Sequence, residues 1–222
     1  MFHGAQHARQ MSFLMQGERD FVAVLGDPVM AVRPLRAELH RLHADQLLRH
    51  WFSRRRLLPV VSAARGEGRT RLALELARSL ASLGVRTLLV DGDLRAPRLH
   101  RELGLPAHGL AEFLGGRELR LAQCAENLAV LAAGRAPAEP LEPLSSPRLR
   151  PLLAAAAARF GAVVIDTPAA HLGPDLQIFA AHAGGALVLA RHGATGRGAL
   201  ARLHASLRAA SARVVGILLR QD

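Results

Sequence analysis

The sequence predicts an α/β fold in which a doubly wound, mostly parallel sheet is flanked by helices. Short apolar runs, suited to strands buried on both faces, alternate with segments whose apolar residues recur at helical spacing. The first clear strand runs into a glycine-containing loop and then into a helix. Strands that alternate with helices in this way form a parallel sheet, since each helix carries the chain back across one face.

The expected elements follow from these patterns in order. A short extended piece is expected at 21–25, and apolar runs predict strands at 57–61, 87–90, 128–131, 162–165, 186–190 and 214–219. Helical spacing predicts helices at 29–51, 71–83, 98–103, 146–160, 174–182 and 196–210. The helix after the loop should stop at Gly84, a residue suited to a helix C-terminus.

The chain length bounds the number of domains. The 222 residues fit one α/β domain with an extension. Residues 1–20 are polar and without a clear period, so we expect a poorly ordered lead-in there. Residues 21–222 are expected to form one domain that includes the helix 29–51.

The charge balance is strongly basic, and every basic residue is arginine. There are 29 basic and 18 acidic residues, which gives a formal charge of +11, and the sequence contains no lysine. Such a balance suggests nucleic acid, an anionic membrane surface, or a phosphorylated or acidic partner, and net charge alone selects none of them. The arginine run at 54–56 lies beside Trp51 and Phe52. It is interpreted either as a membrane-proximal or partner-docking face or as a solvated helix end.

Cysteine content and hydropathy point to the cytoplasm. The single cysteine, Cys124, excludes an internal disulfide and suits a reducing compartment. No apolar run has the length of a signal-peptide core or of a membrane span. The histidines show no metal-ligand spacing, and His171 is interpreted as a loop residue.

Residues 62–70 have the composition of a phosphate-binding loop. Ala63, Gly66 and Gly68 leave room for backbone N–H groups to point at an anion, with the positive end of a helix behind them. Thr70 has the hydroxyl that such loops use for Mg²⁺, whereas Arg69 stands where the consensus has lysine. The alternative is an ordinary strand-to-helix turn that uses glycine for its positive φ.

Three carboxylates follow predicted strands. Asp91, Asp93 and Asp166 all fall at carboxyl ends of strands, where ligands bind in open parallel sheets. Two of these carboxylates and the hydroxyl of Thr70, converging near the loop, would form a site of hard oxygen ligands suited to Mg²⁺ that also binds phosphate oxygens. Taken singly, each aspartate has the alternative role of capping the next helix.

Three segments together resemble a known family. They are Ser62-Ala63-Ala64-Arg65-Gly66-Glu67-Gly68-Arg69-Thr70, Leu88-Leu89-Val90-Asp91-Gly92-Asp93-Leu94-Arg95-Ala96-Pro97-Arg98 and Val163-Val164-Ile165-Asp166-Thr167-Pro168-Ala169. In these segments the sequence resembles the bacterial tyrosine kinases of polysaccharide export (BY-kinases), which belong with MinD- and ParA-type P-loop ATPases. More narrowly it is similar to the soluble EpsG-type members of exopolysaccharide clusters. The resemblance covers about residues 21–220, and the segment 91–98 is its most specific part.

The resemblance implies ATP and Mg²⁺ as cofactors and assigns roles to residues. Backbone N–H groups at Gly66, Glu67 and Gly68 would hold the phosphates, and Asp91 would be the base that accepts a hydroxyl proton. Thr70 and Asp93 would bind Mg²⁺ directly, and Asp166 would orient a metal-bound water. The implied nucleotide-contacting arginines are Arg65, Arg69, Arg71 and Arg95, with Arg69 also counted as catalytic.

Departures from the family leave its function open. The family autophosphorylates a tyrosine cluster, whereas these 222 residues contain no tyrosine, so any phosphoryl transfer must go to a partner, to water or to Ser or Thr. Met30 replaces an acid beside the matching Arg33 and Arg36 of the expected helix. Glu75 and Arg220 each stand where the family has asparagine, and the asparagine that Arg220 replaces lies near adenine.

Three functions remain as hypotheses. The first is a BY-kinase-like ATP-binding regulator of exopolysaccharide synthesis, chain length and export, active in Mg-ATP phosphoryl transfer or hydrolysis. The second is a pseudokinase that acts as an interaction module. A ParA- or MinD-type positioning ATPase is disfavoured, because Ala64 stands where those proteins have a signature lysine. The expected partner is an inner-membrane chain-length determinant of the Wzz/Wzc type, which would bring the protein to the inner face of the membrane. A homo-oligomer is a further expectation, and no nucleic-acid partner is expected.

Overall fold

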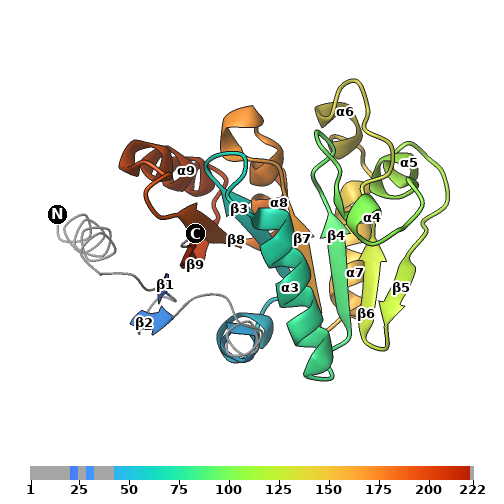
Figure 1. Ribbon diagram of the computed structural model, residues 1–222. Coiled ribbons are helices and arrows are strands. Elements are labelled where there is room, and N and C mark those ends of the chain that lie inside the picture. Colours follow the sequence, from blue (N-terminus) through green and yellow to red (C-terminus); the bar gives the residue numbers. More distant parts are fainter. Residues whose placement is uncertain (1–20, 25–28, 33–42, 221–222) are drawn as a thin grey trace.

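The computed structural model describes residues 21–24, 29–32 and 43–220, and its centre is a seven-stranded sheet (Figure 1). The strand order is β5-β6-β4-β7-β3-β8-β9. All neighbouring strands are parallel except β5, which runs antiparallel to β6 at one edge. The strands are β3 (Leu57–Ser62), β4 (Thr87–Asp91), β5 (Ala122–Ala125), β6 (Leu128–Leu131), β7 (Ala162–Asp166), β8 (Gly185–Arg191) and β9 (Arg213–Arg220).

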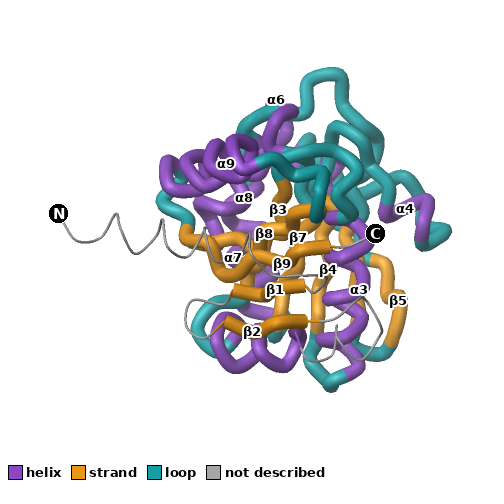
Figure 2. Tube along the Cα trace, turned by 60° about the vertical axis from the view of Figure 1, so that its left-hand side comes forward, coloured by secondary structure: helices purple, strands orange, loops and turns teal. Residues whose placement is uncertain are grey.

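Helices cover both faces of this sheet (Figure 2). They are α3 (Arg69–Ser82), α4 (Leu99–Glu102), α5 (Leu110–Leu114), α6 (Leu141–Leu144), α7 (Leu149–Arg159), α8 (Asp175–Ala183) and α9 (Arg197–Ala209), with a π-helical turn η1 (Leu48–Phe52) and a 3-10 turn η2 (Ala170–Leu172). The fold is therefore the predicted α/β class with a mostly parallel sheet between helical layers.

Alternate residues of each central strand build two separate cores. Leu58, Val60 and Val164 pack with α3 and the helical segment 43–52 on one face. On the other face, Leu57 and Val163 pack with α7, and the apolar sides of α8 and α9 complete the layer. Because consecutive side chains of a strand point to opposite faces, a continuous apolar run is what a doubly covered sheet requires.

The six predicted strands of the sheet are confirmed within one residue at each end, whereas three short elements were missed. These are the exposed edge strand β5 and the one-turn helices α5 and α6. Elements this short have too few residues for a period to be recognised. None of the helices in the described part of the chain combines the length and the apolarity needed to cross a bilayer.

The helix expected at 29–51 is wrong at its start. Residues Val29–Val32 form strand β2, which pairs antiparallel with β1 (Phe21–Val24) in a separate hairpin. The valines favour an extended backbone, and β1 supplies the pairing partner that a helix would lose. Helix is observed from residue 43 to the end of η1, while 33–42, with Arg33 and Arg36, and the lead-in 1–20 lie outside the described residues.

The arginine run at 54–56 is largely tied into the fold. Arg55 donates from Nη1 to the carbonyl of Ala183, at the C-terminus of α8, over 2.9 Å. Arg56 donates from Nη1 to the carbonyls of Phe52 and Gly161 at 2.7 and 3.1 Å. These guanidinium groups satisfy the carbonyls left unpaired where helices and loops end.

Candidate functional site

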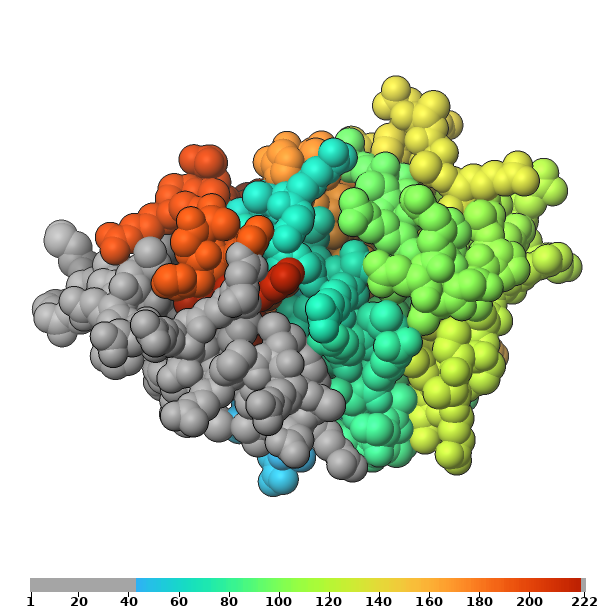
Figure 3. Space-filling model, viewed as in Figure 1, coloured from blue at the N-terminus to red at the C-terminus, as the bar shows by residue number. Residues whose placement is uncertain are grey.

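The loops that carry the predicted site residues meet at one edge of the sheet. Strand β7 lies between β4 and β3, so the carboxyl ends of all three strands are neighbours. In the register of the sheet, Asp166 is opposite Asp91 on one side and Val60 on the other. The loop at 62–70 is called the glycine loop below. In Figure 3 the teal segment that contains this loop and α3 lies between the green segment after β4 and the orange and red C-terminal segment.

The glycine loop depends on two left-handed residues. Gly66 has φ 78° and Gly68 has φ 98°, and Gly68 is the N-cap of α3. The first turn of α3 contains no acidic residue, so the positive end of the helix is not neutralised by its own side chains. These features are those of a loop that binds an anion at a helix N-terminus.

Glu67 holds this loop in shape from inside. Its side chain is buried, at 3% exposure, and Oε2 accepts the backbone N–H of Ala64 at 3.0 Å. Oε1 accepts a hydrogen bond from the hydroxyl of Thr195, in the turn between β8 and α9. Glu67 therefore connects the glycine loop to a segment more than a hundred residues away in sequence.

Arg69, at the position where the consensus has lysine, is buried under the same loop. It donates from Nε to the carbonyl of Thr167 at 2.8 Å and from Nη1 to the carbonyl of Ala64 at 2.8 Å. Nη1 also donates to the hydroxyl of Ser62. Burial lowers the pKa of Arg69, while Asp166, Asp93 and Glu67 act against that shift. The guanidinium of Arg69 therefore donates its hydrogen bonds to the glycine loop and to the residue after β7.

The loop between β4 and α4, residues 92–98, is called the acidic loop, and Asp91 and Asp93 hold its backbone in shape. Asp91 is fully buried and accepts the backbone N–H groups of Asp93 and Leu99, each at 3.2 Å. Oδ1 of Asp93 accepts the N–H groups of Arg95 and Ala96 at 3.1 and 2.9 Å. In the structure Asp91 thus shapes the loop, and its role as a base stays a prediction.

Asp166 is the most telling group of the site. It is 1% exposed and hydrogen-bonds the side chain of Thr70, yet its Oδ1 has no hydrogen-bond partner among the described residues. A buried carboxylate oxygen without a partner is costly, so it calls for a ligand. Among the described residues, no three His, Cys, Asp or Glu side chains are grouped as a metal site. A cation here would need Thr70 and phosphate oxygens besides the carboxylates, which fits Mg²⁺.

The raised pKa values of two of these carboxylates, Asp91 and Asp166, support a cation at this site. Burial, together with Asp166 and Asp93, raises the pKa of Asp91 to about 8. Burial is also the main reason that the pKa of Asp166 rises to about 7, although its hydrogen bond from Thr70 and the charge of Arg69 act against the rise. Like charges crowded in a buried site oppose ionisation, and a divalent cation would relieve that opposition.

The remaining predicted nucleotide-contacting arginines occupy different surroundings. Arg65 is exposed on the glycine loop. Arg71 forms an exposed ion pair with Glu75 at 2.8 Å on the surface of α3. Arg95 faces α8 and pairs with Asp175 at 3.0 Å. Their contacts with a nucleotide stay predictions.

Sequence reasoning missed several residues that complete the site. Asp175, Thr167 and Thr195 bind site residues from other elements, and only Asp175 offered a signal, as an acid at the start of an apolar helix. Arg220 at the end of β9 was not missed, because the resemblance places it near adenine; it reaches the loop, since its Nη1 lies 2.6 Å from the place a Cβ on Gly68 would occupy. His171 contacts the carbonyl of Ala63 through Nδ1 at 3.1 Å.

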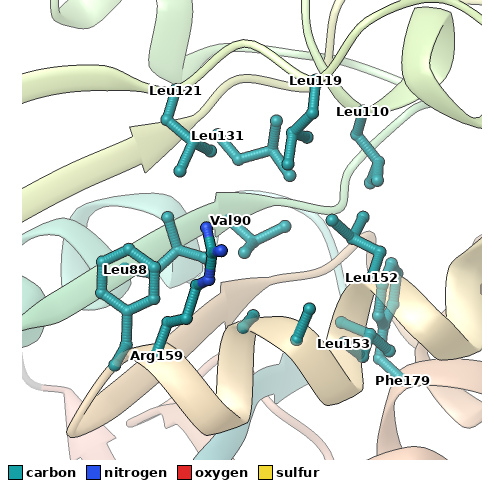
Figure 4. Close-up of a pocket in the computed structure, with 13 residues that line it drawn as sticks. Leu88, Val90, Leu110, Leu119, Leu121, Leu131, Leu152, Leu153, Arg159 and Phe179 are labelled. Carbon is teal, nitrogen blue, oxygen red and sulfur yellow. The ribbon is translucent and has the colours of Figure 1, made fainter.

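An apolar cavity of about 70 Å³ lies away from these loops. Figure 4 shows leucines and valine from β4, β6 and the loop before β5 facing side chains of α7 and α8 across it. Its lining contains no site carboxylate and no residue of the glycine loop. The cavity is therefore separate from the candidate site, although Phe179 of α8 lines it.

Comparison with curated proteins finds bacterial tyrosine kinases. The chain is 34% identical over 122 residues to the tyrosine-protein kinase ptk of Acinetobacter johnsonii, which is 52% of this chain and 16% of that protein. It is 35% identical over 124 residues to the tyrosine-protein kinase YwqD of Bacillus subtilis, covering 54% of this chain and 52% of that protein. The matches thus span about half or less of these relatives, and no protein-family model matches the chain.

Solved structures give the same result. The kinase domain of the Escherichia coli tyrosine kinase ETK superposes with a TM-score of 0.78 at 25% identity, covering 83% of this chain and 75% of that chain. The VpsO kinase domain has a TM-score of 0.77 at 28% identity, with 84% and 94% covered. MinD of Pyrococcus horikoshii, solved with Mg-ADP, shares the fold with a TM-score of 0.61 at 21% identity, covering 73% and 68%. The resemblance to bacterial tyrosine kinases is confirmed, and the likeness to MinD is one of fold.

Proposed function

We propose that this protein binds Mg-ATP where β3, β4 and β7 end and carries out phosphoryl transfer or hydrolysis there as a BY-kinase-like regulator of exopolysaccharide synthesis, chain length and export. The observation that carries the proposal is Asp166, whose buried Oδ1 lies beside Thr70 and the glycine loop and finds no hydrogen-bond partner within the described part of the chain. The kinase relatives support the same class of chemistry.

The residues of the chain divide the work as follows. Backbone N–H groups of Gly66, Glu67 and Gly68 bind phosphate oxygens, supported by the amino end of α3. Thr70 and Asp93 would hold Mg²⁺, and Asp166 would orient a water on that ion. Bound Mg-ATP supplies the phosphoryl group and the charge that neutralises its oxygens. Asp91, which burial and the neighbouring Asp166 and Asp93 make more basic than an ordinary carboxylate by raising its pKa, is the group proposed to accept the proton.

The phosphoryl group cannot be transferred to a tyrosine of these 222 residues. The 222 residues contain no tyrosine. Transfer within them is therefore limited to serine or threonine, and otherwise the acceptor is water or a partner protein. A partner with its own tyrosines would fit the naming of the relatives as tyrosine-protein kinases.

The proposed partner is an inner-membrane chain-length determinant of the Wzz/Wzc type. The described helices include none suited to spanning a bilayer, so docking on such a partner would place the protein at the inner face of the membrane. The basic balance of 29 arginines against 18 acidic residues suits that surface. Self-association into a homo-oligomer is part of the same proposal.

A non-catalytic interaction module is the second candidate, and Arg69 favours it. Its guanidinium binds the carbonyls of Thr167 and Ala64, whereas the consensus lysine reaches the β and γ phosphates. A protein that keeps the fold and loses phosphoryl transfer would retain this arrangement.

Equilibrium binding of Mg-ATP to the purified protein and to Asp93→Ala tests the proposal. We expect micromolar binding that the substitution weakens at least about tenfold, since a charged ligand to the metal is lost. Absent binding, or binding that ignores the substitution, contradicts the nucleotide site. ADP release measured with and without the membrane partner then separates an active enzyme from the interaction module.

A further inference from the structure

We propose that Asp175, at the start of α8, is a positioning residue that holds Asp93 in the orientation needed to bind the metal. The inference rests on the proposed function, because it gives Asp175 a task toward the Mg²⁺ that Asp93 would hold. It is carried by contacts between α8 and the acidic loop on both sides of Asp93.

The orientation of Asp93 is set by the backbone that follows it. The side chain is 8% exposed, and its Oδ1 accepts N–H groups from Arg95 at 3.1 Å and Ala96 at 2.9 Å. In this turn the Asp93 carboxylate is held by backbone N–H groups. Its orientation therefore depends on how firmly the backbone at 95–96 is held. The question is therefore what holds that backbone.

Arg95 provides the first anchor through Asp175. Its Nε donates to Oδ1 and Oδ2 of Asp175 at 3.0 and 3.1 Å, and its Nη2 donates to Oδ2 at 3.0 Å. The Asp175 side chain is fully buried and that of Arg95 is 22% exposed. A charge-assisted contact that uses two guanidinium nitrogens and both carboxylate oxygens fixes the orientation of the Arg95 side chain. Arg95 thus contacts Asp93 through its backbone and Asp175 through its side chain.

Phe179 provides the second anchor from the same face of α8. It lies four residues after Asp175, one helical turn along. A Cβ on Gly92 would lie 2.8 and 2.9 Å from two ring carbons of Phe179, so the ring is packed directly on the Gly92 backbone. Gly92 and Arg95 flank Asp93, and α8 therefore holds the loop before and after the predicted metal ligand.

A purely structural ion pair would tie α8 to the loop without affecting Asp93, and amide hydrogen exchange separates the two roles. In the nucleotide-free protein, Asp175→Asn is expected to speed exchange at Arg95 and Ala96, whose N–H groups bind Asp93, by about tenfold or more. The matched control is Asp45→Asn, which removes an exposed ion pair with Arg49 and is expected to leave both amides unchanged. Wild-type exchange rates at both amides in Asp175→Asn overturn the proposal.

The second readout is the Mg²⁺ requirement for binding a fluorescent ADP analogue. Asp175→Asn is expected to raise the Mg²⁺ concentration for half-maximal binding about tenfold, while binding without Mg²⁺ stays as in wild type. An unchanged Mg²⁺ requirement contradicts the positioning role. If the wild-type protein itself fails to bind, the proposed function fails, whereas the exchange experiment still tests how Asp93 is held.

Removing one partner of a buried pair can prevent folding, so a second variant keeps the test decisive. Leaving Arg95 without its buried partner can unfold the protein, whereas replacing both charges by apolar residues is often neutral. The double variant Arg95→Met with Asp175→Leu is expected to fold and still show fast exchange at residue 96 and a raised Mg²⁺ requirement. Wild-type behaviour of both readouts in this variant means that the ion pair is only structural.

Discussion

Arg69 donates a hydrogen bond from Nε to the carbonyl oxygen of Thr167, the residue after Asp166, over 2.8 Å. The first residue of α3 is thereby joined to the end of β7. The same guanidinium binds Ser62 and Ala64 through Nη1. A lysine ammonium is a single point donor and cannot match a fork that reaches acceptors on two sides. Arginine at this position therefore joins two segments of the site in addition to placing a cation there.

Substitution of Arg69 by lysine should therefore destabilise the fold. Arg69→Lys is expected to lower the free energy of unfolding by roughly 1–3 kcal/mol, because buried acceptors lose their donors. Urea unfolding followed by circular dichroism measures this change. The control Arg117→Lys, at an exposed position, is expected to leave stability unchanged. Equal midpoints for both variants would contradict a bridging role for Arg69.

Stability of the metal-free protein should depend on pH through Asp91. Its folded-state pKa is about 8 against an ordinary value of 3.8, so between these pH values the folded state binds more protons than the unfolded state. The contribution of Asp91 to stability is then fully present below about pH 4 and is lost as pH rises through about 8.

The Asp91→Asn variant removes this titration. Its stability relative to wild type should improve by at least about 1 kcal/mol, the value of one pKa unit, between pH 5 and pH 8.5. Thermal or urea unfolding at both pH values, in the presence of a chelator, gives the comparison. Parallel pH profiles for the two proteins would show that Asp91 does not titrate in this range.

Gly92 should not tolerate a side chain. A Cβ there would lie 2.8 Å from both the Asp166 carbonyl oxygen and a ring carbon of Phe179. Gly92→Ala is expected to cost roughly 1–3 kcal/mol of unfolding free energy by overpacking. Gly196→Ala is the control, since a Cβ at that extended position meets nothing within 4 Å. A loss confined to Gly92→Ala supports the close packing of α8 on the acidic loop.

Arg220 should contribute to nucleotide affinity. Its Nη1 lies against Gly68 at the amino end of α3, where a phosphate is proposed to bind. Arg220→Ala is expected to weaken Mg-ATP binding about tenfold, the effect of losing one charge-assisted hydrogen bond. Isothermal titration with Arg117→Ala as a control of equal charge change measures this. Equal affinities in the two variants would place Arg220 outside the binding site.

Much of the fold was predictable because its signals are local. The apolar runs of the central strands, the glycines at 66 and 68, and the aspartates at strand ends are each readable within a few residues. The segment 29–32 shows the limit of such reading. Its apolar spacing fits a helix, and the choice of strand depends on pairing with Phe21–Val24, which local spacing does not contain.

The sequence by itself determined the class of the fold, the glycine loop and which carboxylates end the strands, since these depend on period, residue size and chain order. Only the tertiary structure decided that β7 lies between β4 and β3, so that Asp91 and Asp166 become neighbours. It also decided that Arg69 binds beneath the loop and that Arg95 pairs with Asp175, eighty residues away. Such pairings depend on which buried donors and acceptors meet after the chain has packed, and no local pattern specifies them.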